Sequence, residues 1–330
     1  MHAALLTAPK TIEVRSLDEP SRQLGESVVR VRSVGLCGTD LKIVSGSIPV
    51  DLPRVLGHEM VGEVVDGDTA GETVLVDPAV ACGMCRQCRE GRGNLCTAGA
   101  LLGRDRDGGL AELIAVPARN LHPLPSGIDV AVAPILQVLA TCVHAQRLTS
   151  IFPGDAIAVL GLGVTGLLHV QLARQRGARP IVGTSRSASK LEAARGLGAD
   201  MAVAASDDVV DSMREVASDG FDLVIDCVGS IATLAHAVAL ARIGGRVLAY
   251  GTIDETSSGV FPWYQLYFKE LVLTHPRSAN AEDFPVAIDL VARHAVQVEL
   301  LISHRFRLDD AASAFETAGA PGAMKVVVDV

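Results

Sequence analysis

Four of the seven cysteines stand close together and have the spacing of a metal site. They form a C-x2-C-x2-C-x7-C pattern made by Cys82, Cys85, Cys88 and Cys96. Four thiolates at such a spacing can complete the closed tetrahedral shell of a structural Zn²⁺ ion. Two disulfides or an iron–sulfur cluster would use the same residues, but a reducing compartment disfavours the first and nothing nearby indicates electron transfer. The pattern therefore predicts a structural zinc ion.

A thiolate, an imidazole and an adjacent carboxylate form a second candidate metal site at Cys37, His58 and Glu59. Three protein ligands and an open fourth position are what a catalytic zinc ion requires. Each residue also has an ordinary explanation, because a lone cysteine often packs as a small hydrophobic residue and a loop histidine is often only hydrogen-bonded. Taken alone, these three residues leave both interpretations open.

A glycine-rich turn between an apolar run and a helical segment indicates a nucleotide site. The run 156–160 leads into Gly161-Leu162-Gly163-Val164-Thr165-Gly166, and a helical pattern follows to residue 176. In this context the turn lets a pyrophosphate approach backbone N–H groups at a helix N-terminus, and glycine removes the Cβ atoms that would block it. We predict that a dinucleotide is bound by Gly161, Gly163, Val164 and Gly166.

The end of the following strand, about 20 residues beyond the turn, selects between NAD and NADP. An Asp or Glu at this place holds the ribose 2′-hydroxyl of NAD and repels a 2′-phosphate. This chain instead has Ser185 and Arg186, and Lys190 follows one helical turn later. A hydroxyl and two cationic groups suit a phosphate. The sequence therefore predicts NADP as the cofactor, with NAD less favoured.

Two patterns of secondary structure divide the chain. Short strands with Gly, Pro and Asp turns, one of them at 37–40, predict a β-rich barrel or partly open sandwich over the first 120 or so residues. After Pro134 strands and helices alternate, which requires a parallel sheet with helices on both faces. The expected helices are 164–176, 189–197, 208–217 and 232–242; the strands are 180–184, 201–204, 222–227, 245–250 and 271–274. The tail predicts a helix at 281–294, a strand at 302–307, a helix at 309–318 and a last strand at 325–330.

Length, composition and net charge exclude several classes of protein and of binding partner. A chain of 330 residues holds about two domains, and 49% hydrophobic with 20% charged residues is typical of a globular protein. The net charge of −9 and the lack of a basic cluster disfavour nucleic acid and anionic membranes as partners. The first residues lack the pattern of a secretion signal, and no apolar run reaches the about 18 residues of a membrane span. We therefore expect a cytoplasmic protein that acts on a small molecule.

Together these motifs resemble the zinc-dependent medium-chain alcohol and polyol dehydrogenases. The resemblance covers essentially the whole chain, since segments 268–271, 301–306 and 325–328 fit as well. It implies an α/β protein with a GroES-like, β-rich catalytic domain over 1–147 and 277–330. A Rossmann domain with a doubly wound parallel sheet, over 148–276, would interrupt it. We also expect a homodimer or homotetramer.

The resemblance also implies roles for individual residues. In this family a cysteine and a histidine matching Cys37 and His58 hold the catalytic zinc, and the glutamate matching Glu59 ligates in some members and exchanges in others. The hydroxyl matching Thr39 takes the proton of the alcohol, and the carboxylate matching Asp40 orients the zinc-binding histidine. The implied reaction is hydride transfer between an alcohol carbon and a nicotinamide.

Several positions match the family pattern loosely or depart from it. Lys42 stands where many members have a histidine that passes the proton to solvent. Gln137 falls where the family places a fourth ligand of the catalytic zinc, and packing near the cleft is the alternative. Thr141 falls where the family places a residue against the nicotinamide. The remaining cysteines, Cys142 and Cys227, are expected to pack in the core.

Other functions use the same fold. A zinc-free quinone or enoyl reductase would have no use for the two cysteine-containing sites, and a non-catalytic nucleotide-binding protein would have no need of Cys37 or His58. A zinc-containing relative that reduces an activated C=C or C=N bond stays open, as does an NAD-dependent sugar or cyclitol dehydrogenase. The favoured prediction is an NADP-dependent oxidoreductase that interconverts an alcohol or polyol with the matching ketone or aldehyde.

Overall fold

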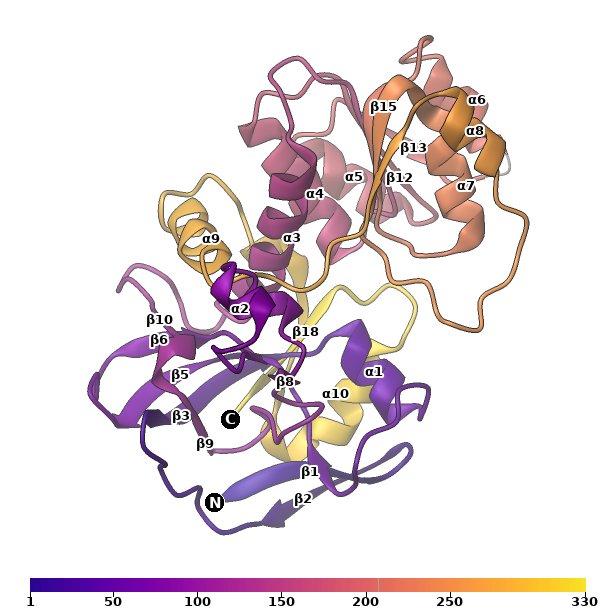
Figure 1. Cartoon of the computed structure of the whole chain (residues 1–330). Coiled ribbons are helices and arrows are strands. Elements are labelled where there is room, and N and C mark those ends of the chain that lie inside the picture. Colours follow the sequence, from indigo (N-terminus) through magenta and orange to yellow (C-terminus); the bar gives the residue numbers. More distant parts are fainter. Residues whose placement is uncertain (207) are drawn as a thin grey trace. The chain divides into compact units, whose positions relative to one another are not determined.

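A computed structural model describes residues 1–206 and 208–330 of the chain (Figure 1). The chain divides into two compact units. The first, here called the terminal unit, comprises Met1–Ala140 and Ser278–Val330. The second, the central unit, comprises Thr141–Arg277. Helix α3 (Ile135–Thr149) begins in the terminal unit and ends in the central one.

The terminal unit is built on a seven-stranded sheet, in which β10-β6-β5-β3-β18-β17 are neighbours in this order and β9 also pairs with β3. Its strands are β3 (Glu26–Gly35), β5 (Glu59–Asp66), β6 (Thr73–Val76), β9 (Leu113–Pro117), β10 (Leu121–Pro123), β17 (Ile302–Arg307) and β18 (Lys325–Asp329). Two smaller sheets contain β1 (His2–Ala8), β2 (Thr11–Ser16) and β4 (Arg54–Val55), and β7 (Ala79–Val80) and β8 (Ala100–Leu101). Strands of this kind bury one face, and the core that they enclose contains Val29, Leu56, Met60 and Leu110.

Short helices complete the terminal unit. They are α1 (Gly38–Val44), α2 (Arg86–Arg89), α9 (Asp283–Ala292) and α10 (Ala311–Ala318). Single 3-10 turns are η1 (Gly93–Leu95), η2 (Ala118–Asn120), η3 (Glu299–Leu301) and η4 (Leu308–Asp310). Helix α10 packs against β2, β17 and β18, so the last segments of the chain cover part of the same sheet.

The central unit contains six parallel strands in the order β13-β12-β11-β14-β15-β16. These strands are β11 (Ile157–Leu160), β12 (Ile181–Ser185), β13 (Met201–Ala204), β14 (Phe221–Asp226), β15 (Ala241–Ala249) and β16 (Val272–Thr274). The helices between them are α4 (Val164–Gln175), α5 (Ala188–Gly196), α6 (Val209–Arg214), α7 (Ile231–Leu240) and α8 (Trp263–Phe268). Helix α4 packs with α5 and α6 with α7, which forms the two helical layers of a doubly wound sheet.

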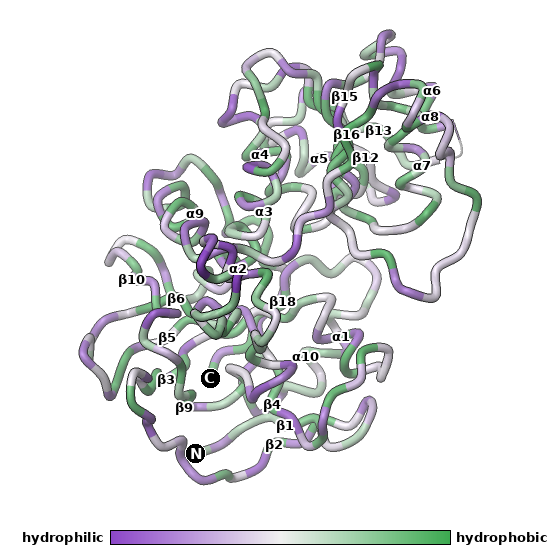
Figure 2. The backbone as a smooth tube through the Cα atoms, viewed as in Figure 1, coloured by the Kyte–Doolittle hydropathy of each residue, from purple (hydrophilic) through white to green (hydrophobic). Residues whose placement is uncertain are grey.

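The predicted alternation of strands and helices is therefore confirmed. Strands β11 and β12 are buried along their whole length, which is why their sequences are apolar runs rather than alternating ones. Figure 2 shows the hydrophobic residues gathered along the strands of the central sheet. Among the described residues, no helix is long and apolar enough to cross a bilayer.

One local prediction is wrong, and two helices were not predicted. The segment predicted as a turn at 37–40 is the start of α1, with Cys37 as the N-cap residue. Helix α3 was not predicted, although Gln137, Thr141 and His144 stand at helical spacing. Most of the helix is buried and apolar, which weakens the contrast between its two faces. Helix α8 has six residues, Trp263–Phe268, and its aromatic composition gives no helical signal.

Candidate metal and cofactor sites

Strand register brings the second metal site together. Strands β3 and β5 run antiparallel with Gly35 opposite Glu59. Cys37 comes two residues after Gly35, and His58 comes directly before Glu59, so both leave the sheet at the same edge. Residues that are separated along the chain thus become neighbours through one pair of hydrogen-bonded strands.

The potential ligand atoms of Cys37, His58 and Glu59 all lie within 4.8 Å of one another. His58 and Glu59 are buried, whereas Cys37 is partly exposed. One thiolate, one imidazole and one carboxylate are donors that suit Zn²⁺, and this arrangement leaves room for a further ligand. These residues therefore fit the zinc ion that the sequence predicts.

Asp40 holds two of these residues in place. Its Oδ1 lies 3.1 Å from Nδ1 of His58, and its Oδ2 accepts a 2.9 Å hydrogen bond from the backbone N–H of Cys37. A proton on Nδ1 that faces the carboxylate leaves Nε2 with a lone pair for a metal. Burial alone would lower the pKa of His58, but Asp40 and Cys37 raise it well above its usual value. A bound cation would have to displace that extra proton.

Lys325 is a member of the site that sequence reasoning missed. Strand β18 pairs antiparallel with the other side of β3, with Val327 opposite Gly35, so Lys325 reaches the same edge. Its Nζ lies 2.7 and 2.6 Å from the two carboxylate oxygens of Glu59 and donates to Leu36 O at 2.9 Å. Burial alone would lower the pKa of Lys325, but Glu59 and Cys37 raise it, so the ammonium group stays charged. The available signal was a lysine at the start of a strand, directly before three valines.

Two glycines make space for this arrangement. A Cβ atom at Gly35 would lie 2.2 Å from Oε2 of Glu59, so only glycine allows the carboxylate to lie there. Gly57 has φ +89°, and a Cβ atom would lie 2.7 Å from Cγ1 of Val34. A side chain at Gly57 would be strained both by its backbone and by this contact.

The other residues predicted for this site lie in helices. Thr39 and Lys42 belong to α1, and both are partly exposed. Gln137 is buried in the first turn of α3. The catalytic role of Thr39 and the ligand role of Gln137 stay predictions.

The four-cysteine site has the geometry of one closed shell. All four sulfur atoms lie within 4.8 Å of one another, and none is in a disulfide. The distance is 3.5 Å between Cys85 and Cys88, 3.9 Å between Cys85 and Cys96, and 4.0 Å between Cys82 and Cys88. Ligands on a tetrahedron with Zn–S bonds of about 2.3 Å are about 3.8 Å apart. The sulfur atoms therefore fit a single zinc ion.

Electrostatics in this cluster also favour a cation. Backbone N–H groups lower the pKa of Cys82 and lower that of Cys85 to about 5. Burial, followed by hydrogen bonds with the sulfur atoms of Cys85 and Cys96, raises the pKa of Cys88 to about 12. The segment is tied to the rest of the terminal unit by Asn280, which donates to Gly91 O, and by Arg119, which donates to Ala81 O.

For each glycine of the dinucleotide turn, the structure shows a different reason why a side chain would be unfavourable. Gly161 has φ +89°, and a Cβ atom there would lie 2.6 Å from Cγ2 of Val228. A Cβ atom at Gly166 would lie 2.0 Å from Gly161 O. Around Gly163, no heavy atom of the described chain lies within 4 Å of such a Cβ atom, so space is open beside the N-terminus of α4. Val164 is the first residue of α4, and the N-cap residue Gly163 has no side chain that could cap the helix. The first backbone N–H groups of α4 can therefore donate to a phosphate. The turn fits a pyrophosphate.

The end of β12 carries the residues predicted to select the cofactor. Ser185 is the last residue of β12, and its Oγ accepts a 3.2 Å hydrogen bond from the backbone N–H of Ser187. Arg186 is exposed, and Lys190 is partly exposed in the first turn of α5. This end of the strand therefore presents a hydroxyl and two cationic side chains. Thr141 lies in the part of α3 that belongs to the central unit.

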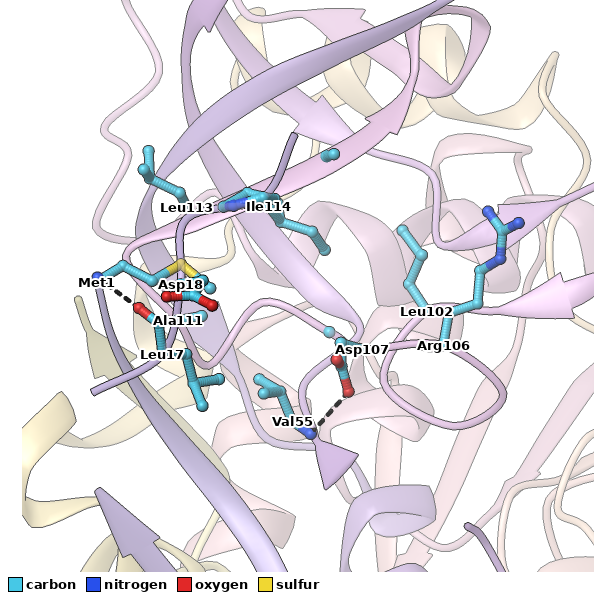
Figure 3. A pocket seen from close by; sticks show the side chains of 13 residues that line it. Met1, Leu17, Asp18, Val55, Leu102, Arg106, Asp107, Ala111, Leu113 and Ile114 are labelled. Atoms are coloured by element: carbon cyan, nitrogen blue, oxygen red, sulfur yellow. Dashed lines mark hydrogen bonds between the residues drawn. The ribbon is translucent and has the colours of Figure 1, made fainter. Parts of the chain in front are cut away.

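A separate cavity of about 280 Å³ lies in the terminal unit (Figure 3). Its walls include Leu17, Leu102 and Ile114. At its edge Asp107 accepts a 3.1 Å hydrogen bond from the backbone N–H of Val55. None of the residues predicted for the metal or cofactor sites lines this cavity.

Comparison with known proteins defines the family. Residues 23–126 match the alcohol dehydrogenase GroES-like domain, and residues 164–293 match the zinc-binding dehydrogenase domain. The L-galactonate-5-dehydrogenase of Escherichia coli (strain K12) is 31% identical over 96% of this chain and 94% of its own length. The chain belongs to the family of zinc-dependent medium-chain alcohol and polyol dehydrogenases, and it is an oxidoreductase.

Two solved structures resemble the whole chain. A putative zinc-binding dehydrogenase from Sinorhizobium meliloti 1021 bound to NADP has a TM-score of 0.93 and 34% identity, covering 100% of this chain and 99% of that one. An alcohol dehydrogenase from E. coli CFT073 complexed with NADH has a TM-score of 0.93 and 29% identity over the same shares. These likenesses confirm the predicted fold class of a GroES-like domain with a Rossmann domain.

The four-cysteine site can be tested by metal content. We predict that Cys96→Ser lowers the zinc content by one ion per chain and lowers the melting temperature, because metal binding stabilises the folded segment. Metal analysis and thermal unfolding of the purified protein would measure both. The control is Cys227→Ser, which removes a thiol outside both cysteine-containing sites and should keep the full zinc content. Full zinc content in Cys96→Ser would refute the structural role.

Proposed function

We propose that the chain is an NADP(H)-dependent, zinc-dependent dehydrogenase that interconverts a polyol-type secondary alcohol and the matching ketone. The observation that carries the proposal is the register of β3 and β5, which joins Cys37 and His58 beside Asp40. The terminal unit would be the catalytic domain and the central unit the dinucleotide-binding domain. A polyol is favoured because the similar L-galactonate-5-dehydrogenase is named for a polyhydroxy acid.

The proposed mechanism assigns each side chain a task. Cys37 and His58 would hold the zinc ion, with Glu59 beside them and Gln137 as a further candidate ligand. When bound, zinc supplies a Lewis acid for the substrate oxygen, and the nicotinamide supplies the hydride acceptor. The hydroxyl of Thr39, two residues after Cys37, would accept the proton of the alcohol while it gives up its own toward solvent, and it would thus act as a relay.

Residues around this set fix its orientation. Asp40 keeps Nδ1 of His58 protonated and fixes the backbone of Cys37 through the hydrogen bonds described above. Lys325 holds both oxygens of Glu59 and lowers the negative charge that the carboxylate offers to a cation. The residues that position the ligands are thus distinct from those that handle the proton.

The function can be tested by following the absorbance of the reduced nicotinamide with a panel of polyols, sugar acids and secondary alcohols. We predict turnover by the wild type and its loss, by at least about 10³-fold, in Cys37→Ser and His58→Ala, because the metal carries the charge that develops on oxygen. NADPH binding should persist in both variants. His2→Ala, which changes an exposed histidine, is the control and should stay active. Turnover in either site variant would disprove the zinc mechanism.

The cofactor preference can be tested by reversing it. We predict that the wild type uses NADP with higher kcat/KM than NAD, since Arg186 and Lys190 can pair with a 2′-phosphate. The double variant Ser185→Asp, Arg186→Ala should prefer NAD, because the carboxylate would hold the ribose 2′-hydroxyl and repel the phosphate. Lys190→Ala should weaken NADP binding without affecting NAD. Equal kcat/KM values for both cofactors in the wild type would contradict the assignment.

An exposed aromatic surface on the central unit favours a homo-oligomer. Trp263, Tyr264, Tyr267 and Phe268 of α8 are between 59% and 80% exposed. Strand β16 follows α8, lies at one end of the central sheet and exposes Val272 by 59%. Exposed aromatic side chains on a short helix and an edge strand with one paired neighbour are each typical of an interface. We propose that a second copy of the chain covers this surface.

Light scattering tests this interface. We predict that Trp263→Asp combined with Tyr267→Asp shifts the mass in solution from an oligomer to a monomer, because two buried carboxylates without partners are strongly unfavourable. Leu24→Asp is the control, since Leu24 is fully exposed in the terminal unit, far along the chain from this surface. A wild type that is monomeric, or a double variant with unchanged mass, would refute the proposal.

A further inference from the structure

Three adjacent parallel strands of the central sheet place particular residues at one edge. Gly161 follows β11, Cys227 follows β14 and Tyr250 follows β15. Because these strands are parallel neighbours, the residues after their carboxyl ends lie at the same edge of the sheet. In doubly wound sheets ligands bind beyond this edge, where the strand order reverses.

The two ends of a dinucleotide fall on different sides of the glycine turn. The pyrophosphate fits the N-terminus of α4, directly after β11. The adenosine ribose belongs beside Ser185, at the end of β12, on one side of β11. The nicotinamide end must then lie on the other side, over the ends of β14 and β15. Tyr250 stands at this side.

The hydroxyl of Tyr250 joins helix α3 to the sheet edge. It lies 2.6 Å from Oγ1 of Thr141, and Sγ of Cys142 donates to it at 3.7 Å. Since the phenol oxygen accepts from Cys142, its own proton is available for Thr141. Cys142 Sγ also lies 3.9 Å from the carbonyl oxygen of Thr165, in the first turn of α4. Thr141 and Tyr250 both remain partly exposed, as contact with a cofactor requires.

The ring of Tyr250 is itself held from the protein interior. His169 of α4 is fully buried, and its ring packs edge-on against that of Tyr250, with centroids 4.8 Å apart and an interplanar angle of 80°. Gln146 fixes His169, because its Nε2 lies 3.1 Å from Nδ1 and donates to the His169 carbonyl oxygen at 3.0 Å. Burial and Arg176 lower the pKa of His169 to about 3, so the imidazole is neutral. Burial raises the pKa of Tyr250 well above its usual value, so the phenol keeps its proton.

We propose that Tyr250 is a positioning residue for the nicotinamide end of the cofactor, acting through the hydrogen bond that fixes the hydroxyl of Thr141. The inference rests on the proposed function, because it assumes that a nicotinamide dinucleotide binds the central unit. The hydrogen bond to Tyr250 restricts rotation of the Thr141 side chain about χ1, so that the side chain presents one surface to the ring. The pre-set orientation lowers the entropy that binding must remove.

Two ligands separate the nicotinamide end from the rest of the cofactor. NADPH contains the nicotinamide, whereas 2′-phospho-ADP-ribose carries only the other parts. We expect Tyr250→Phe to weaken NADPH binding about three- to tenfold, the value of one ordinary hydrogen bond, and to leave 2′-phospho-ADP-ribose binding unchanged. Thr141→Val should have the same effect. Titration calorimetry of the full chain measures both affinities.

A double-mutant cycle tests whether Tyr250 acts through Thr141. The double variant should bind NADPH no more weakly than either single variant, because both remove the same hydrogen bond. Thr149→Val is the matched control, since it removes a buried hydroxyl of the same helix that is bonded to Ala145 O at 3.3 Å, and it should leave both affinities unchanged. Should Tyr250→Phe fail to fold, Thr141→Val still gives the comparison between the two ligands.

Two results would overturn the inference while leaving the proposed function intact. One is an equal loss of affinity for NADPH and 2′-phospho-ADP-ribose in the single variants, which indicates a general structural effect. The other is additive losses in the double variant, which indicate that the two hydroxyls act separately. A wild type that binds neither ligand would instead disprove the proposed function, and this inference with it.

Discussion

The buried ion pair between Lys325 and Glu59 is the interaction on which the proposed catalytic site depends. Lys325 Nζ lies within 2.7 Å of both carboxylate oxygens, and both side chains are almost completely buried. An unpaired charge in such a place costs several kcal/mol, and removing one partner of a buried pair typically costs about 3–5 kcal/mol. The pair therefore holds the start of β18 beside the end of β3 and the start of β5. Any side chain at this edge is constrained by the same three strands.

The pair also explains the charge balance of the site. Cys37 as a thiolate, Asp40 and Glu59 contribute three negative charges to a small and mostly buried volume. Lys325 and a divalent cation together contribute three positive charges, so the occupied site is formally neutral. Without the cation, Asp40 and Cys37 raise the pKa of His58. A proton on His58 then supplies part of the positive charge that the cation would bring. A neutral zinc environment keeps the ion a stronger Lewis acid than an anionic one would.

The two cysteine-containing sites show what a sequence can and cannot predict. The ligands of the first site, Cys82 to Cys96, come from one short segment, so their spacing alone predicted that they gather. The second site is assembled by strand register, and Lys325 is separated from Glu59 by 266 residues. No local sequence pattern spans that separation. Residue types alone made Cys37 and His58 candidate ligands, and the family resemblance was needed to favour zinc binding over ordinary packing. The parallel sheet was predicted because its strands and helices alternate in order. Helix α3 was missed because its polar residues, such as Gln137 and His144, are themselves buried among apolar ones.

The same comparison separates the proposed tasks of the two zinc ions. Four thiolates around Zn²⁺ give a shell with a formal charge of about −2, which makes the ion a weak Lewis acid and leaves no open position. Its excess charge is met in part by backbone N–H groups that donate to Cys82 and Cys96. The site at Cys37 has one thiolate, an imidazole and a carboxylate already bonded to an ammonium group. Fewer anionic donors and an open position favour substrate chemistry there, while the cysteine cluster stabilises its own segment.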